Sequence, residues 1–479
     1  MATISKERGV SSSQPNCLDT GDVFLLLGLP ANIQVGHDIV AFRTVKKGDD
    51  GFRDIPQGPH FLWVDAETEP QSGASRLPGR CGYWYFTESN PEIRLKQWDK
   101  YNEVLGEVAS KTEVVERKAN IETIYPTLRS FDLREGEANS ARLSASPGVN
   151  TASPKPGAPQ YGPPPSRPIE AILVWRELTW AISDTFLQRV TNKTCSNEWL
   201  VDSSDSVKRE HQFPYHRATA HQTSITSEFS FLFEDDLADL YILDKMLTKE
   251  DAGDTSARVT ALLGNPTANI TENDIVAEMQ FTYIMATDLR NAACLTQWLD
   301  FVLKIMLRSW TLVRSHPVLC RNLIHSLHAQ LSHSASYGVH DGLKGSKELD
   351  IASEPPRRPD LPNNKLLFNY VPQFGRKLRR ALTVYKHRLD EMLSLELGKC
   401  ATPDQKAVGN ALRNLEGFLW QFKWDLGLTT GRDEEKEEQE EDKADGGGAA
   451  VDVDGEDDDY LPLIVDVDEN GREAGLVSF

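Results

Sequence analysis

The chain has 479 residues and a net charge of −20, but this charge is unevenly distributed. From Arg432 onward it contains 19 acidic and 4 basic residues, a net charge of −15, so the rest of the chain carries only about −5. A nearly neutral body offers no basic surface for a phosphate backbone, which disfavours direct nucleic-acid binding. The length exceeds that of one ordinary core and predicts two domains with additional tails.

The six cysteines are scattered and form no Cys-x-x-Cys pair, and no run of 18 apolar residues occurs. The first 17 residues are polar and rich in serine, without the apolar core of a signal peptide. We therefore expect an intracellular protein without a membrane segment, whose thiols are reduced and mostly fill cores.

The first 20 residues are predicted to be disordered, and residues 21–130 to form a β-sandwich-like domain with helices after its strands. Short apolar segments separated by Gly and Pro indicate the strands. They are residues 23–28, 36–45, 60–64 and 81–86, with a charged turn at residues 46–51. From residue 93 to residue 125 the spacing of apolar residues favours helices that pack on this β layer.

Residues 51–64 are the most informative segment of this domain. Ile55, Pro56 and Gly58 fit a type I turn, because Pro presets φ at its second position and Gly suits its fourth. After Pro59 the chain alternates, with His60 and Leu62 on one face and Phe61 on the other. Large apolar groups on both faces predict a strand inside a packed β layer.

A Pro/Gly-rich linker is predicted for residues 131–168, since 11 of the 25 residues from 144 to 168 are Pro or Gly. Residues 169–428 predict an α-helical C-terminal domain with no strands between the helices. Its clearest start signals are Thr271 with Asp274, and Thr402-Pro403 with Gln405. Apolar residues at helical spacing predict helices around residues 172–186, 231–247, 275–289, 295–306, 319–331, 378–392 and 408–426.

The acidic tail, residues 429–479, is predicted to be disordered except for a terminal β segment at residues 460–468. That segment contains a β-branched run that has no partner strand within the tail. The fold class is thus multidomain α+β: a β-sandwich-like N-terminal domain, a linker, an all-α C-terminal domain and an acidic tail ending in a strand.

No catalytic, metal-binding or cofactor-binding residue is predicted. Two histidine groups, His325/His328/His333 and His211/His216/His221, lack the spacing of a zinc site. Residues 466–471 match the first half of a calcium loop, but Val477 stands where a bidentate Glu is required. Phosphate-binding loops and nucleophile motifs are absent from the sequence, so nothing nominates an enzyme.

Several segments together resemble one family, the Aar-two splicing factors, which are assembly chaperones of the U5 small nuclear ribonucleoprotein. Each segment is short, but they occur in the family's order over most of the chain. The resemblance rests on residues 36–38, 51–62 and 82–84, on residues 278–283 with 297–299, and on residues 422–425 with 459–465. It assigns structural motif positions to Ile55, Pro56, Gly58, His60, Phe61, Phe281, Trp298 and Trp424.

The resemblance implies a protein without catalytic activity that acts in the nucleus and the cytoplasm. It implies binding to the large central scaffold of the spliceosome, pre-mRNA-processing factor eight, at its RNase H-like and C-terminal domains. The particle's RNA helicase would later take its place.

The tail sequence supports a mechanism for such binding. An extended segment suits addition to the edge of a partner's sheet, with main-chain hydrogen bonds giving affinity and alternate side chains filling pockets. The predicted contact residues are Leu461, Pro462, Leu463, Ile464, Val465 and Val467, with Pro462 at the start because it has no N–H. Docking of this strand on its own chain is the alternative arrangement. The alternative function is an enzyme of unknown reaction with a site at the interdomain cleft.

Overall fold

The computed structural model describes residues 18–44, 48–65, 79–131, 168–194, 198–207, 228–233, 253–337 and 374–427. All of them belong to one compact unit, Met1–Gly427. The expected linker at residues 131–168 lies almost wholly outside the described residues, as does the whole tail from residue 428, so the expected domain boundaries stay predictions.

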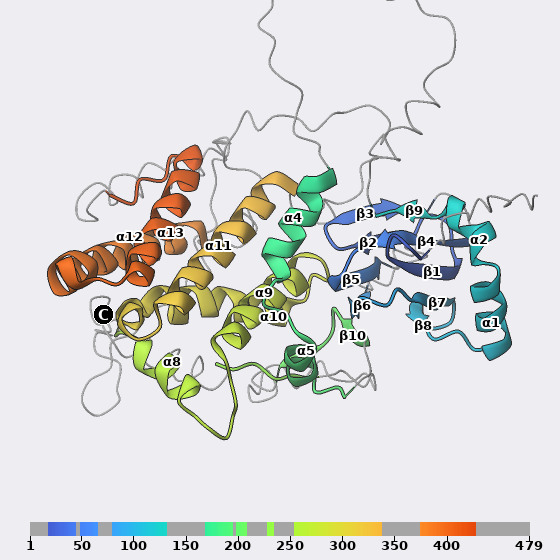
Figure 1. Ribbon diagram of the computed structural model, residues 1–479, viewed down its shortest axis with the longest axis horizontal. Coiled ribbons are helices and arrows are strands. Elements are labelled where there is room, and N and C mark those ends of the chain that lie inside the picture. Colours follow the sequence, from blue (N-terminus) through green and yellow to red (C-terminus); the bar gives the residue numbers. More distant parts are fainter. Residues whose placement is uncertain are drawn as a thin grey trace, which may run out of the picture. The chain divides into compact units, whose positions relative to one another are not determined.

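Two five-stranded sheets form the N-terminal β-rich part (Figure 1). The first sheet has the order β8-β7-β1-β4-β9 and the second the order β10-β6-β5-β2-β3. The strands are β1 Asp22–Leu29, β2 Gln34–His37, β3 Val40–Arg43, β4 Gly48–Ile55, β5 Gly58–Asp65, β6 Arg80–Thr87, β7 Ile93–Asp99, β8 Val104–Gly106, β9 Arg129–Ser130 and β10 Glu198–Asp202. The turn between β4 and β5 carries the chain from the first sheet to the second.

Strand β1 is buried on both faces, as its unbroken apolar sequence predicted. Phe24 and Leu26 pack between the two sheets, whereas Val23 and Leu25 face the opposite side. There they meet Ile121 of α2 (Ile121–Ile124), and the partly buried Val114 of α1 (Lys111–Ala119) packs against the same cluster. These short helices therefore cover the outer face of the first sheet (Figure 1).

Strand β5 is also buried on both faces, which confirms the expectation for residues 60–64. Leu62 and Val64 point between the sheets, whereas Phe61 and Trp63 belong to the large core formed with the helices. The second sheet is therefore a middle layer, with the first sheet on one side and helices on the other.

Three expectations for the β-rich part were wrong. Residues 36–45 form a hairpin rather than one strand, because Asp38 adopts a left-handed conformation (φ 54°) in the two-residue turn between β2 and β3. Residues 46–51 are not wholly a turn, since β4 begins at Gly48. Residues 93–99 form strand β7, parallel to β1, and helical structure begins only at Lys111.

The helical part contains α4 Pro168–Thr179, α5 Asp184–Thr191, α8 Ser256–Leu263, α9 Glu272–Thr287, α10 Ala292–Asp300, α11 Pro317–Tyr337, α12 Phe374–Glu391 and α13 Pro403–Leu419. Both predicted capping boxes are confirmed. Thr271 and Asp274 exchange hydrogen bonds at the start of α9, and Thr402 and Gln405 do so at the start of α13.

The segment expected to be all-helical also contains strands. Strand β10 pairs with β6 of the second sheet, and β11 (Ser206–Val207) pairs with β12 (Glu228–Phe229). The single helix expected around residues 172–186 is instead the pair α4 and α5, because the Ser183 hydroxyl accepts a hydrogen bond from the Phe186 N–H and starts a new helix. The helix expected after residue 231 falls mostly outside the described residues.

No helix in the described ranges is long and apolar enough to cross a membrane. Among the described cysteines, Cys81, Cys294 and Cys320 are buried, Cys400 is exposed, and none of the four is in a disulfide.

Candidate functional site

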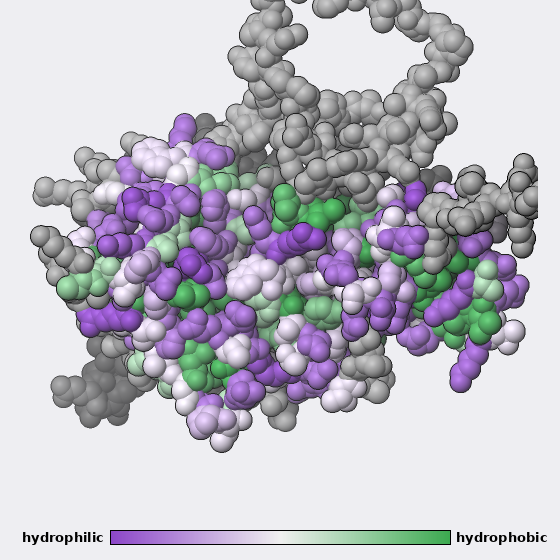
Figure 2. Space-filling view, viewed as in Figure 1, coloured by the Kyte–Doolittle hydropathy of each residue, from purple (hydrophilic) through white to green (hydrophobic). Residues whose placement is uncertain are grey.

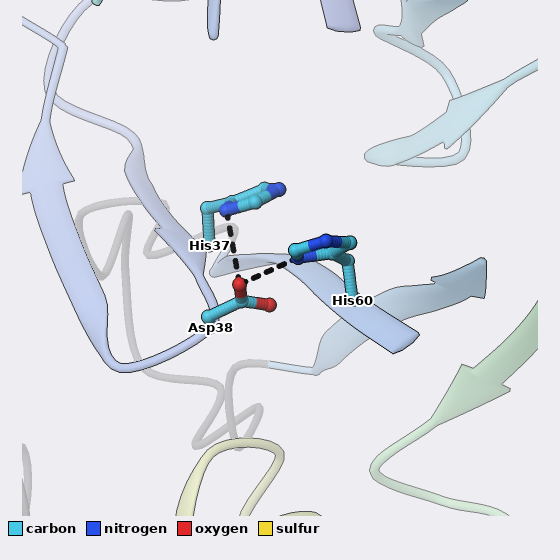
Figure 3. Close-up of side chains that lie close together, drawn as sticks. All are labelled: His37, Asp38 and His60. Atoms are coloured by element: carbon cyan, nitrogen blue, oxygen red, sulfur yellow. Dashed lines mark hydrogen bonds and ion pairs between the residues drawn. The ribbon is translucent and has the colours of Figure 1, made fainter. Parts of the chain in front are cut away.

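The family-motif residues before and in β5 meet the β2–β3 turn at one buried point (Figure 3). His60 Nδ1 lies 2.7 Å from Asp38 Oδ2, and His60 Nε2 donates to the Pro56 carbonyl oxygen at 2.8 Å. The other carboxylate oxygen of Asp38 accepts from the Phe61 N–H at 2.9 Å, and the Asp38 N–H donates to the Phe61 carbonyl at 2.8 Å. Asp38 therefore attaches the hairpin turn to β5.

His37 lies beside this pair. Its Nε2 is hydrogen-bonded to the Tyr85 hydroxyl, and its Nδ1 is 3.7 Å from Asp38 Oδ2, beyond hydrogen-bonding distance. The ring is 1% exposed and packs against Phe52, with a centroid distance of 4.5 Å. Burial lowers the pKa of His37 to about 4, although the nearby Asp38 carboxylate opposes this shift. The ring is therefore neutral near pH 7.

A cavity of about 680 Å³ opens next to this cluster. His37 and Asp38 form part of its wall, together with Phe42 of β3, Arg129 of β9 and Phe131. The Arg129 guanidinium lies 3.7 Å from the centre of the Phe42 ring. The cavity thus lies where the end strands of the two sheets, β3 and β9, face each other.

Helix α4 closes one side of the cavity with Ile172 and Trp175. The Trp175 Nε1–H donates to the Pro59 carbonyl at 2.7 Å, which fixes this helix to the start of β5. Hydrophobic surface gathers over α4 in the space-filling view (Figure 2), and Leu173 on this helix is 51% exposed. The cavity and an exposed apolar helix therefore adjoin.

An aromatic cluster joins the second sheet to the helices. Phe281 of α9 has ring-centre distances of 6.0 Å to Trp84, 5.8 Å to Phe186 and 5.6 Å to Phe229. Trp84 in turn lies 5.0 Å from Phe61. The motif residues Phe61 and Phe281, far apart in the sequence, thus lie in one core.

Arg80 forms a polar link at the same junction. Its Nε donates to Asp65 Oδ2 at 2.8 Å, its Nη1 donates to the Asp288 carbonyl oxygen at 2.5 Å, and its guanidinium stacks on Trp63. Burial raises the pKa of the Asp288 carboxyl to about 7, although the positive charge of Arg80 opposes the shift.

Buried polar side chains of α9 explain why its motif is not wholly apolar. Glu278 accepts hydrogen bonds from the Leu232 N–H (2.6 Å) and the Gln297 side chain (3.2 Å). Gln280 accepts from the Ala181 N–H at 3.0 Å and donates to the Glu177 carbonyl at 3.2 Å. These side chains satisfy the backbone of segments that cross α9, a role that the sequence analysis missed.

The remaining motif residues lie away from the Asp38–His60 contact. Trp298 donates to Gln330 Oε1 at 2.9 Å inside the helical core, and Trp424 packs at its edge. Ile55 is buried between the sheets at the end of β4, and Gly58 opens β5 with a φ of +138°.

The tail residues from Leu461 to Val467 lie outside the described residues, as do the partial calcium loop and His211, His216 and His221. In the other histidine group, His333 contacts the Tyr283 hydroxyl at 3.0 Å on the packed face of α11.

Among the described residues, the group of His, Cys, Asp and Glu side chains with converging ligand atoms is His37, Asp38 and His60. Sequence reasoning missed this group because Asp38 and His37 are brought to His60 only by sheet pairing.

Comparison with protein families decides the identity of the chain. Residues 20–192 match the model of the AAR2 N-terminal domain, and residues 236–427 match the model of the AAR2 C-terminal repeat region. The chain belongs to the Aar2 family of splicing factors. A search of curated proteins found no match.

Membership of the Aar2 family places the chain among splicing assembly factors. Both family models lie in the compact unit, and the N-terminal one extends through α4 and α5. Asp38 and His60 therefore lie inside the N-terminal match and α9 lies inside the C-terminal match. Phe229 and Leu232, which contact α9, lie between the two matched segments, and the acidic tail follows both.

Proposed function

We propose that this Aar2-family protein is a non-enzymatic assembly chaperone of the U5 small nuclear ribonucleoprotein in pre-mRNA splicing. It binds the large central scaffold protein, pre-mRNA-processing factor eight, and is later displaced by the particle's RNA helicase. It acts in the nucleus and the cytoplasm. The match of both family models, in order along one chain, is the observation that carries this proposal.

Part of the binding comes from the tail. Residues 460–468 are added as a strand to an exposed sheet edge of the scaffold, with Leu463, Val465 and Val467 on one face and Ile464 on the other. The strongly acidic residues before this segment keep the tether solvated. Ordering such a tail costs on the order of 2–5 kcal/mol of the interaction energy, which suits a partner that must later leave.

Removing the tail tests this mechanism. A chain ending at residue 431 should capture a purified scaffold fragment, containing the RNase H-like and C-terminal domains, more weakly than the full chain does. Its thermal unfolding should be unchanged, since the compact unit ends before the tail. A lower melting temperature would instead indicate that the strand docks on its own chain.

A proline substitution separates main-chain pairing from side-chain contacts. Val465→Pro removes an N–H from the middle of the added strand and should weaken capture more than Val465→Ala does. Asp452→Pro, in the tether, is the matched control and should leave capture unchanged. Equal capture by Val465→Pro and the unmodified chain would contradict strand addition.

The competing function is an enzyme with a site between the β-rich and helical parts. One observation favours it: the cavity has walls from both parts, with His37 and Asp38 beside Ile172 and Trp175. The two proposals differ in a direct way, because an enzyme consumes a substrate without the scaffold. Failure of the full chain to capture the scaffold fragment, together with metabolite turnover, would overturn the chaperone proposal.

A further inference from the structure

Three buried side chains direct ligand atoms at one point beside the β2–β3 turn (Figure 3). One ligand atom from each of His37, Asp38 and His60 lies within 4.8 Å of the other two. Asp38 Oδ2 is 2.7 Å from His60 Nδ1 and 3.7 Å from His37 Nδ1. Ligand atoms of a tetrahedral zinc ion are on the order of 3.3 Å apart, given bonds of about 2.0–2.1 Å. These two distances would therefore change by about 0.6 Å and about 0.4 Å on ion binding.

The Nε2 atoms of both histidine rings already have hydrogen-bond partners. His37 Nε2 contacts the Tyr85 hydroxyl, and His60 Nε2 donates to the Pro56 carbonyl oxygen. Such partners orient the ring and fix its tautomer in metal sites, so that the other nitrogen is presented to the ion. His37 Nδ1 is the second sign of a ligand site, because it is buried and has no hydrogen-bond partner within the described ranges.

The hydrogen bonds around His60 are compatible with a bound ion. His60 Nε2 donates to the Pro56 carbonyl oxygen, and His60 Nδ1 lies 2.7 Å from Asp38 Oδ2. A cation at the convergence point would replace the direct contact between these last two atoms and bridge them instead. The hydrogen bonds at both Nε2 atoms would be kept.

We propose that His37, Asp38 and His60 bind a divalent transition-metal ion of the zinc type. Two imidazoles and one carboxylate form a donor set that suits such ions, whereas Ca²⁺ and Mg²⁺ prefer oxygen ligands. The adjoining cavity, whose wall includes His37 and Asp38, supplies the entry path and a water for the fourth position. The bound ion would hold the β2–β3 turn on β5, and this inference does not depend on the proposed partner.

Metal titration of the full chain tests the site. After removal of metal with a chelator, the protein is titrated with Zn²⁺ alone in competition with a chromophoric chelator, and with Co²⁺ alone while visible absorption is recorded. We expect one tight equivalent of zinc and cobalt bands of tetrahedral intensity. The acidic tail offers only oxygen ligands, which give weak, octahedral cobalt spectra.

His37→Gln should abolish the tight equivalent and the intense cobalt bands. The matched control is His387→Gln, which changes an exposed histidine on α12 and should leave both signals unchanged. Circular dichroism checks that each variant is folded. Weak bands in the unmodified protein, or intense bands that persist in His37→Gln, would overturn the proposal.

A second variant keeps all three ligands. Tyr85→Phe removes only the hydroxyl that holds His37 Nε2, and loss of such a partner lowers metal affinity about 10- to 100-fold. We expect weaker zinc binding at an unchanged stoichiometry of one. An unchanged affinity would contradict the assigned geometry even if His37→Gln failed to fold.

Discussion

At the scale of single residues, two glycines make room for the aromatic side chains of β5. A Cβ on Gly36 would lie 2.0 Å from the Trp63 indole, and a Cβ on Gly82 would lie 2.6 Å from the Phe61 ring. Gly36 and Gly82 are the paired neighbours of β5 on its two sides. The Trp63 and Phe61 rings therefore lie directly over the backbones of β2 and β6.

Gly36→Ala should therefore destabilise the fold. The added methyl group cannot be accommodated without moving the buried Trp63, and overpacking of this kind costs about 1–3 kcal/mol. Urea unfolding followed by tryptophan fluorescence measures the loss. Gly106→Ala is the control, because nothing lies within 4 Å of its added Cβ. Equal midpoints for both variants would contradict the close packing.

Asp288 predicts a specific pH dependence. Its pKa is about 7 in the folded protein and 3.8 in an unperturbed chain. Between these values the folded state holds a proton that the unfolded state has released, so the free energy of unfolding falls as the pH rises from about 4 to 7. Asp288→Asn should reduce this fall. Urea unfolding at pH 5 and pH 7.5 measures it, and identical pH dependence of the two proteins would exclude the shifted pKa.

At the scale of elements, β10 shows how charged residues attach a distant strand. Lys96 and Arg94 of β7 are 1% and 8% exposed, and both pair with Glu198 of β10. The Lys96 ammonium also pairs with Glu107 and lies 4.3 Å from the Tyr83 ring centre. Glu198 thus links β10, in the second sheet, to the first sheet.

Glu198→Ala should loosen β10, because it leaves Arg94 and Lys96 with fewer partners in a buried position. Removing one partner of a buried pair costs about 3–5 kcal/mol, and the partial exposure of Glu198 places this case at or below the lower end. Hydrogen exchange of β10 amides should accelerate. Glu92→Ala, which removes a 60% exposed partner of the same Arg94, should leave this exchange unchanged. Equal rates in both variants would refute the link.

The individual strands and helices show how much of the fold the sequence could predict. Strands β1, β5 and β6 and the starts of α9 and α13 were predictable because their signals are local: apolar runs, a Pro-Gly turn and capping boxes. Strand β7 was not, because its buried Arg94 and Lys96 resemble a solvent-exposed helical face. Strand β10 was not, because five residues carry little signal and their partner β6 is more than a hundred positions away. The His37–Asp38–His60 cluster likewise depends on pairing between strands.

At the scale of the whole molecule, the β-rich and helical parts share one core. Phe61, Trp63 and Trp84 of the second sheet belong to the same buried cluster as the side chains of α9, α11 and α13. Arg80 and Trp175 add hydrogen bonds across this junction. Neither part covers the apolar face that it contributes to this shared core without the other.

We therefore expect residues 18–427 to unfold in one cooperative transition. Phe281→Ala, at the centre of the junction, should lower the stability by about 3–5 kcal/mol and should accelerate hydrogen exchange in β1 and in α13 alike. Calorimetry and exchange together test this expectation. Two separate heat-absorption peaks, or an effect confined to the helices, would contradict a shared core.

The middle position of the second sheet has a consequence for synthesis on the ribosome. The nascent chain releases β5 and β6 long before β10 and α9, so Phe61, Trp63 and Trp84 have no complete covering layer until α9, which ends at Thr287, has emerged. Exposed apolar sheet surface promotes aggregation during that interval. An N-terminal fragment that ends before α4 would keep this surface exposed. We therefore expect the nascent chain to depend on general chaperones until α9 has been synthesised.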